Sequence, residues 1–355
     1  MAKKTSALHE KDGVIKPNST QKKSIDIIKK KRAKKNSVEE YVNHIIDGDI
    51  TYLSKAITLI ESTNPKHQKV ANEIIDQCLP HASQSVRIGI TGVPGVGKST
   101  FIEAFGKHLT SQGKKIAVLA VDPSSTVNKG SILGDKTRME QLVTDANAFI
   151  RPSPSGTTLG GVARKTRETI VLCEAAGFDT IIIETVGVGQ SETMVHSLVD
   201  FFLLLKLAGA GDELQGIKRG IIEMADAIVI NKADSGNEKN TKIARSEFTR
   251  ALHLYPIKES EWQPKVLTAS ALHNKGIQEV HDMIQEYLHL TCENRYFEAR
   301  RNEQNKFWLF NTIEEQLKSN FYHHPEIKKE LQSELEKIEN GETTPFNAAK
   351  RLLNL

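Results

Sequence analysis

The sequence predicts an α/β fold: a mostly parallel sheet with interspersed helices, and further helical segments at either end. Three observations lead to this class. After Pro80, short apolar and β-branched runs alternate with helical patterns. The runs contain few polar residues, as expected of strands that are buried on both faces of a sheet. The stretches before and after this region repeat apolar residues at spacings of three and four, which is typical of helices.

The chain of 355 residues is long enough for one large or two ordinary domains. We expect four parts along it: a disordered basic leader over 1–36, a helical extension over 37–80, the α/β domain over 81–290, and a helical arm over 291–355. No internal repeat is visible.

The positive charge of the chain is concentrated in the leader. The net charge is +4, but residues 1–35 hold 12 Lys and Arg against three Asp and Glu, so the leader carries +9 and the rest −5. Such a segment is too poor in apolar residues to pack, and we interpret it as solvated. Contact with nucleic acid or an acidic partner stays open. A mitochondrial transit peptide fits less well, because those favour Arg and avoid acids.

Composition points to a cytoplasmic protein. No run approaches the ~18 apolar residues of a membrane span. The most apolar stretch, "FFLLLKLAGA", is broken by Lys206 after five residues, and the first residues have no apolar segment typical of a signal peptide. The three cysteines, Cys78, Cys173 and Cys292, are far apart, so neither a disulfide framework nor a paired-cysteine metal site is indicated.

The helical extension begins with a cap signal. Ser37 precedes "VEEYVNHIIDG", and Glu40 follows three residues later, as in a capping box. Two further helical patterns follow before Pro80. Beyond Pro80, the runs that we expect to form strands are "VRIGIT", "KIAVLAVD", "AFIRP", "DTIIIET", "DFFLLLK", "DAIVINK" and "PKVLTAS". Ligands of such sheets bind at the carboxyl ends of the strands, where the polar motifs stand.

A glycine-rich motif follows the first run and precedes a helical pattern. It matches G-x-x-x-x-G-K-[ST] and one further threonine: Gly92, Val93, Pro94, Gly95, Val96, Gly97, Lys98, Ser99 and Thr100. Glycines let backbone N–H groups converge on phosphate oxygens, and the helix N-terminus adds positive potential. Lys98 can reach the β- and γ-phosphates, Ser99 can hold Mg²⁺, and Thr100 is placed near the α-phosphate. Because the G-x-G-x-x-G spacing of dinucleotide folds is absent, the motif predicts a P-loop NTPase domain.

Two later motifs indicate guanine. Asn231, Lys232 and Asp234 follow the run "AIVI", and Ser270, Ala271 and Leu272 follow "KVLT". The carboxylate of Asp234 can accept both the ring N–H and the exocyclic amine of guanine, whereas adenine would leave the acid unpaired. Asn231 can brace the loops, the Lys232 stem can stack on the base, and the second motif can close over the purine. GTP is therefore expected rather than ATP.

Three acids are candidates for the metal side of the site, together with Ser99. Glu184 ends "TIIIE" and is followed by Gly187 at the spacing E-x-x-G, Asp122 ends "IAVLAVD", and Asp135 lies in "ILGDKTRM". Mg²⁺ takes oxygen ligands, usually one or two carboxylates with phosphates and water. Which of the three bind the ion directly, and which through water, stays open.

The sequence lacks one catalytic group. Ras-like GTPases carry a Gln directly after the glycine of this motif, where it orients the attacking water. Here Val188 takes that place and Gln190 follows two residues later. We therefore expect slow intrinsic hydrolysis, with the missing group supplied by a partner or by the loop Leu207 to Gly220. In that loop Asp212, Gln215, Lys218 and Arg219 could turn toward phosphate; an ordinary surface loop is the alternative.

Together these motifs resemble a known family. "GVPGVGKST", "VDPSS", "GDKTRM", "ETVGVGQSE", "AGAGDELQGIKRGI", "NKAD" and "SAL" are similar, in order and spacing, to the MeaB/ArgK/MMAA family of GTPases associated with methylmalonyl-CoA mutase. The resemblance runs from about Ser37 to the C-terminus and leaves out the leader. A small departure is Thr268-Ala269 before "SAL", with His273-Asn274 after it.

The resemblance implies a GTPase domain of the metallochaperone-like kind with an N-terminal extension and a C-terminal dimerisation arm. It also implies a homodimer that binds GTP or GDP and Mg²⁺, gates adenosylcobalamin delivery, and protects or reactivates the mutase. The family's phosphate-loop residues carry over to Gly92 through Thr100, its metal-side acids to Asp122, Asp135 and Glu184, and its base-reading residues to Asn231, Lys232, Asp234 and Ser270 to Leu272. The loop around Gln215 and Lys218 matches the segment that couples hydrolysis to the partner, and we expect Lys98, Glu184, Gln215 and Lys218 to be the catalytic residues. An older label for such proteins, a kinase of amino-acid transport, has no separate support in the residues.

The arm sequence agrees with a dimer. In "RRNEQNKFWLFNTIEEQL", more apolar surface lies on one helix than a lone terminal helix can hide: Phe307, Trp308, Phe310, Ile313 and Leu317. The helix either folds back on its own domain or packs on a second copy, and we expect the second.

Two other functions compete with the mutase chaperone. A nickel metallochaperone would be expected to carry a His-rich tract or a Cys pair near the P-loop. Only His81 lies close, and His323-His324 is the sole adjacent pair among 12 histidines. A nucleic-acid-binding or scaffolding protein that uses the basic leader and only senses nucleotide is the other alternative. We expect no membrane association, and we expect a mutase rather than nucleic acid as the partner.

Overall fold

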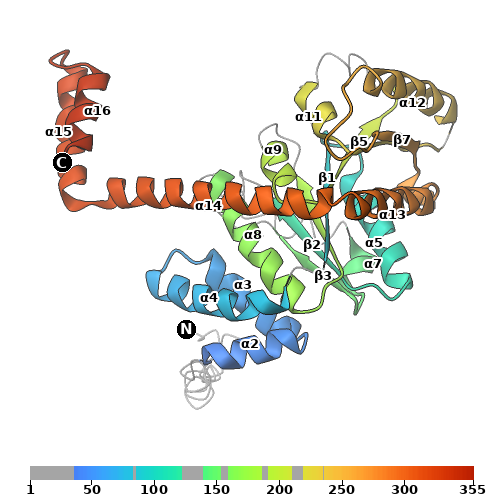
Figure 1. Cartoon of the computed structure of the whole chain (residues 1–355), viewed down its shortest axis with the longest axis horizontal. Coiled ribbons are helices and arrows are strands. Elements are labelled where there is room, and N and C mark those ends of the chain that lie inside the picture. The colour runs from blue at the N-terminus through green and yellow to red at the C-terminus, as the bar shows by residue number, and fades with distance from the viewer. Residues whose placement is uncertain are drawn as a thin grey trace, which may run out of the picture.

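A computed structural model describes residues 36–82, 85–121, 139–152, 159–185, 191–209, 219–234 and 236–355. All seven strands of the sequence analysis are present and form one sheet (Figure 1). They are β1 (Val86–Gly92), β2 (Ile116–Val121), β3 (Ala148–Arg151), β4 (Thr180–Thr185), β5 (Phe201–Leu207), β6 (Ala227–Asn231) and β7 (Lys265–Thr268).

Every pair in this sheet is parallel, in the order β3-β2-β4-β1-β5-β6-β7. The predicted α/β class with a parallel sheet is confirmed. The central strands are apolar on both faces because helices cover both faces. On β4, Ile181 and Ile183 pack into one core cluster while Ile182, between them, packs into the other.

The N-terminal helices lie on the first face, where they pack mainly against a helix that follows β3. They are α2 (Val38–Ile46), α3 (Ile50–Glu61) and α4 (Pro65–Cys78), followed by the short η1 (Leu79–His81). The predicted cap is present, since Ser37 Oγ accepts a hydrogen bond from the Glu40 N–H at 3.1 Å. The Glu40 carboxylate accepts a hydrogen bond from Tyr52 Oη at 2.6 Å, so it links α2 to α3. Helices α8 (Leu159–Ala175) and α9 (Ser191–His196) complete this layer.

The second face is covered by α5 (Lys98–Ser111) and α13 (Ile277–Glu293), which pack against β1 and β5. Around them lie α7 (Glu140–Val143) and η2 (Ala271–His273). Helices α11 (Arg219–Met224) and α12 (Glu238–Leu252) lie beside β5 to β7 at one edge of the sheet (Figure 1).

The C-terminal arm is helical, as predicted. Helix α14 (Tyr296–His323) crosses the α/β domain and then projects beyond it, and α15 (Pro325–Glu339) and α16 (Pro345–Leu353) form a hairpin at its far end (Figure 1). No helix among the residues of the described ranges combines the length and the apolar composition needed to span a bilayer.

The arm is fixed at its base by polar contacts. Arg301 donates to both carboxylate oxygens of Asp200, at 2.9 and 2.8 Å, and to the Ser85 carbonyl at 2.6 Å. Further along, Gln304 donates to the Val199 carbonyl at 2.8 Å. The guanidinium–carboxylate pair uses two parallel donors, which defines its orientation as well as its strength.

One of the five apolar arm residues packs on its own domain, and the other four remain exposed. Trp308 is buried in the core of its own α/β domain and donates to the Ser197 carbonyl at 3.2 Å. The other four, Phe307, Phe310, Ile313 and Leu317, stay 45% to 64% exposed. One residue thus anchors the arm, while an apolar stripe remains on its surface.

Candidate functional site

The phosphate loop connects the carboxyl end of β1 to α5. It leaves a central strand with β4 on one side and β5 on the other, so its backbone is held by the middle of the sheet. Gly97 adopts φ +92, and a Cβ there would lie 2.9 Å from the Asn231 amide nitrogen. At Gly92 a Cβ would meet the Leu205 carbonyl oxygen at 2.7 Å. These two glycines are therefore required by geometry and not only by the motif.

Lys98 curls back over this loop. Its Nζ donates to the Gly92 carbonyl at 2.8 Å and to the Val93 carbonyl at 3.3 Å, and the residue is buried, with 9% exposure. A buried ammonium that is held by backbone carbonyls inside a glycine-rich loop is a ready cationic donor for phosphate oxygens. The chemistry of this loop fits a triphosphate.

Ser99 and Glu184, both predicted to hold Mg²⁺, come together beside the phosphate loop. Ser99 Oγ donates to Glu184 Oε1 at 3.5 Å, although the residues are 85 positions apart. The register of the sheet explains this, because Glu184 on β4 is paired with Ile90 on β1 and Ala120 on β2. A hydroxyl and a carboxylate beside the phosphate loop are hard oxygen donors that suit Mg²⁺.

The base side is built at the ends of β6 and β7. Lys232 takes a left-handed φ of +59, and its Nζ donates to the Gly95 carbonyl at 2.9 Å. The Ala233 N–H donates to the Ala269 carbonyl at 3.0 Å, so the two base-side segments are stitched together by their backbones. Ser270, which is fully buried, donates from Oγ to the carboxylate of Asp234. That contact orients the acid predicted to recognise guanine.

Asn231 joins the two halves of the site. Its Nδ2 donates to the Val96 carbonyl at 2.9 Å, and its Oδ1 accepts from the Ala271 N–H at 3.4 Å. The side chain is buried, with 2% exposure. One amide therefore spans from the phosphate loop to the second base-side segment, which is the bracing role expected of it.

The structure thus brings together Lys98, Ser99, Glu184, Asn231, Lys232, Asp234, Ser270 and Ala271. Leu272 is 71% exposed at the outer side of this group. Gly92 ends β1, Val93 to Gly97 form the loop that leads to α5, and Thr100 lies in the first turn of α5. The predicted Asp122, Asp135, Gln215 and Lys218 lie outside the described residues, as do Val188, Gln190 and Asp212.

A pair of threonines was missed by the sequence analysis. Thr185 Oγ1 donates to Thr91 Oγ1 at 2.8 Å, and both side chains are buried where β4 and β1 end. This hydrogen bond lies one residue beyond Glu184 and one residue before Gly92, so it holds the metal side against the phosphate loop. The signal was a polar residue at the end of each apolar run, which is too common to single out without the pairing of the strands.

The fold and the site define a P-loop GTPase. Its phosphate loop follows a central parallel strand, a carboxylate lies beside the loop's serine, and the acid predicted to recognise guanine follows β6. The comparisons with known proteins then give the family. The family model "Methylmalonyl Co-A mutase-associated GTPase MeaB" matches residues 53–326. The chain belongs to this family of GTPases.

Individual relatives agree over nearly the whole chain. A putative GTPase of Caulobacter vibrioides is 48% identical over 316 residues, covering 89% of this chain and 97% of the relative. GTPase ArgK of Escherichia coli K12 is 45% identical, with 89% and 96% covered. The mitochondrial methylmalonic aciduria type A homolog of Mus musculus is 44% identical, with 89% and 79% covered.

A solved structure matches the fold. The crystal structure of a LAO/AO transport system kinase superposes with a TM-score of 0.70 at 38% identity, and the match covers 89% of this chain and 96% of the other.

Proposed function

We propose that this GTPase is a chaperone of methylmalonyl-CoA mutase or a related acyl-CoA mutase, which gates adenosylcobalamin loading and protects or reactivates the enzyme. Membership of the family of mutase-associated GTPases supports the choice of partner. The observation that carries the switching role is Asn231, which ties the phosphate loop to the base-side segment. Because both halves of the site hydrogen-bond to this side chain, a movement of the phosphate loop on hydrolysis would also move the base-side segment.

In this proposal each part of the site has a defined task. The backbone of Gly92 to Thr100 and the ammonium of Lys98 hold the phosphates, and Asp234, oriented by Ser270, selects guanine. Ser99 and Glu184 would hold Mg²⁺, with Asp122 and Asp135 as further acids; the ion supplies positive charge to the phosphates when bound. Hydrolysis by the protein alone is expected to be slow, because Val188 replaces the glutamine of Ras-like enzymes.

We also propose that the protein is a homodimer held by the arm. The apolar stripe on α14, defined by Phe307, Phe310, Ile313 and Leu317, is 45% to 64% exposed among the residues that the structure describes. Contiguous apolar surface of this kind marks an interaction site. A nickel chaperone stays the alternative; in the described ranges no group of three or more His, Cys, Asp or Glu is placed to hold a metal ion.

The experiment mixes the purified protein with a candidate cobalamin mutase and measures GTP hydrolysis with and without it. We expect hydrolysis to rise with the mutase, and adenosylcobalamin transfer to the mutase to depend on the nucleotide. Lys98→Ala should remove nucleotide binding and both effects. Equal affinity for guanosine and adenosine nucleotides would refute the proposed guanine site, and hydrolysis that ignores every mutase tested would refute the proposed partner.

A further inference from the structure

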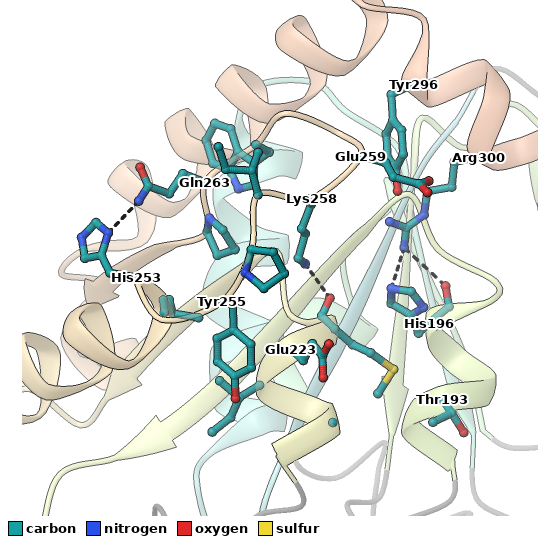
Figure 2. Close-up of a pocket in the computed structure, with 18 residues that line it drawn as sticks. Thr193, His196, Glu223, His253, Tyr255, Lys258, Glu259, Gln263, Tyr296 and Arg300 are labelled. Atoms are coloured by element: carbon teal, nitrogen blue, oxygen red, sulfur yellow. Dashed lines mark hydrogen bonds between the residues drawn. The ribbon is translucent and has the colours of Figure 1, made fainter.

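A cavity of about 680 Å³ lies away from the nucleotide loops (Figure 2). Its walls come from α9, α11, the segment between α12 and β7, and the first turns of α14. Asp226, which pairs with the lining residues Lys258 and Arg300, directly precedes β6, and its N–H donates to the carbonyl of Phe202 near the start of β5 at 2.8 Å. The cavity therefore lies at the amino ends of β5 and β6, whereas the phosphate loop follows the carboxyl end of β1.

The walls are largely apolar and fixed in place. Ile222, Leu252 and Trp262 are buried, with 3% to 7% exposure, and Met224, Tyr255, Pro256 and Pro264 add to the lining. The Trp262 indole N–H donates to the Asp226 carbonyl at 2.8 Å, which holds the ring. A concave space of this volume, with apolar walls and a few placed polar groups, is typical of a site for a small molecule.

Two cations at the inner end share one carboxylate. Lys258 Nζ lies 3.0 Å from Asp226 Oδ1, and Arg300 Nη1 lies 3.9 Å from Oδ2. The same Oδ2 also accepts the Phe202 N–H at 2.9 Å. Asp226 is 1% exposed, and the side chains of Lys258 and Arg300 are 24% and 11% exposed. Burial alone would lower the pKa of Arg300, but the Asp226 carboxylate raises it above its usual value, so Arg300 stays a cation in the cavity wall.

Other polar groups near Arg300 are Tyr296, with which it shares a hydrogen bond, His196 and, on the same side of the cavity in Figure 2, Glu259. Arg300 donates to His196 Nε2 at 3.1 Å, and burial together with the charge of Arg300 lowers the pKa of His196 to about 4. The imidazole is therefore neutral at physiological pH. Two other carboxylates of the lining, Glu223 and Glu259, are exposed to solvent. In Figure 2, Arg300, His196 and Tyr296 lie on one side of Lys258, while Tyr255, His253 and Gln263 lie on the other.

We propose that this cavity binds a small organic acid with an apolar body. Its carboxylate would pair with Arg300, and its hydrocarbon part would lie along Ile222 and Trp262. A guanidinium binds a carboxylate through charge-assisted hydrogen bonds, and the walls exclude water from the rest of the molecule.

The position of the cavity also connects it to the nucleotide site. Helix α9 begins seven residues after Glu184 and ends in the cavity wall at His196. Helix α11 follows the loop that begins at Leu207, and it ends in the same wall at Met224. In sequence, the cavity residue His196 therefore lies only twelve residues after Glu184 of the nucleotide site. We infer that binding of the organic acid changes the affinity for the guanine nucleotide, and that the nucleotide changes the affinity for the acid by the same factor. This inference rests on the proposed function.

Binding is tested by calorimetry on the full chain without nucleotide, with sodium octanoate as the probe. Octanol and octylamine, of the same chain length, serve as neutral and cationic comparisons. We expect octanoate to bind about tenfold more tightly than octanol, a difference of about 1.4 kcal/mol, and octylamine not to bind. Three equal affinities, or no binding of octanoate, would overturn the proposal.

Two variants locate the site. Arg300→Gln should remove the advantage of octanoate over octanol, and thermal unfolding reports whether the variant folds. Glu223→Trp adds bulk from an exposed helical position of the lining and should abolish binding of all probes. Its matched control is Glu73→Trp, the same change at an exposed position of α4 outside the cavity. If Glu223→Trp binds octanoate as Glu73→Trp does, the assignment is wrong.

Coupling is measured as the change in GDP affinity on adding octanoate. We expect a shift of severalfold in the wild type and none in Glu223→Trp. If octanoate binds but the GDP affinity does not change, the coupling is refuted and the binding site is still supported. Failure of GDP to bind at all would instead refute the proposed function, because the calorimetric test needs no nucleotide.

Discussion

Asn231 donates a hydrogen bond to the carbonyl oxygen of Val96, 2.9 Å away across 135 positions of sequence. Its other amide atom accepts from Ala271. The position of the phosphate loop and the position of the base-side segment therefore depend on the same side chain.

Replacing Asn231 by alanine should weaken binding of GDP and GTP together. The change leaves the buried Val96 carbonyl and Ala271 N–H without this partner, which costs about 1–3 kcal/mol. We expect a loss of nucleotide affinity of at least tenfold, measured by titration with a fluorescent guanine nucleotide. Asn240→Ala is the control, since Asn240 is exposed and donates only to Asn237 in the described structure. A variant that bound nucleotide normally would show that the brace is dispensable.

Gly97→Ala should abolish nucleotide binding. A side chain at φ +92 costs about 1–2 kcal/mol, and the new Cβ would also press on the Asn231 amide at 2.9 Å. Gly113→Ala is the matched control, because Gly113 has φ +80 but no described heavy atom within 4 Å of an added Cβ. Both variants should lose similar stability from the backbone, whereas only Gly97→Ala should lose affinity. The combined readout is thermal unfolding with and without GDP.

His196 should make the protein less stable in mild acid. Its pKa falls from 6.5 to about 4 on folding, because of burial first and the charge of Arg300 second. The folded state therefore binds fewer protons, so this contribution is complete above pH 6.5 and is lost as the pH falls toward 4. The loss should reach about 2–3 kcal/mol.

The measurement is urea unfolding between pH 7 and pH 4. His196→Gln should flatten the dependence, while the same change at His289, an exposed residue, should leave it as in the wild type. Parallel curves for wild type and His196→Gln would contradict the assignment.

Charges placed on the exposed stripe of α14 should separate the proposed dimer. Phe310 and Leu317 are each 64% exposed, so Phe310→Asp with Leu317→Asp removes no core packing. We expect the wild type to sediment as a dimer and the double variant as a folded monomer with unchanged GDP binding. Leu254→Asp, at a residue of the α/β domain that is 87% exposed, should stay dimeric. A wild-type monomer at micromolar concentration would remove the dimer.

The parallel sheet could be predicted because the composition of its strands shows that both faces are buried. Residues such as Ile181 to Ile183 are apolar without alternation, which only a strand covered on both faces requires. The phosphate and guanine motifs could be predicted because their chemistry needs particular residues at fixed spacings. Whether the arm packs on its own domain could not, since Trp308 and Phe310 look alike in sequence and differ only in what the fold places beside them.

The cavity gave no signal in the sequence. His196, Glu223, Lys258 and Arg300 come from four separate segments, and none belongs to a motif. Only the order of the strands brings them to one edge of the sheet. The same is true of the Thr91–Thr185 contact, which depends on β1 and β4 being neighbours although β2 and β3 lie between them in sequence.

Helix α14 has one further consequence. Its 28 residues form a single rod, about 42 Å long at 1.5 Å per residue, and its base is bolted to Asp200 by Arg301. A displacement of the distal end of α14 would therefore be transmitted to Asp200, which directly precedes the first residue of β5. A protein that grips the far hairpin could therefore signal to the catalytic domain mechanically, without ever touching the nucleotide.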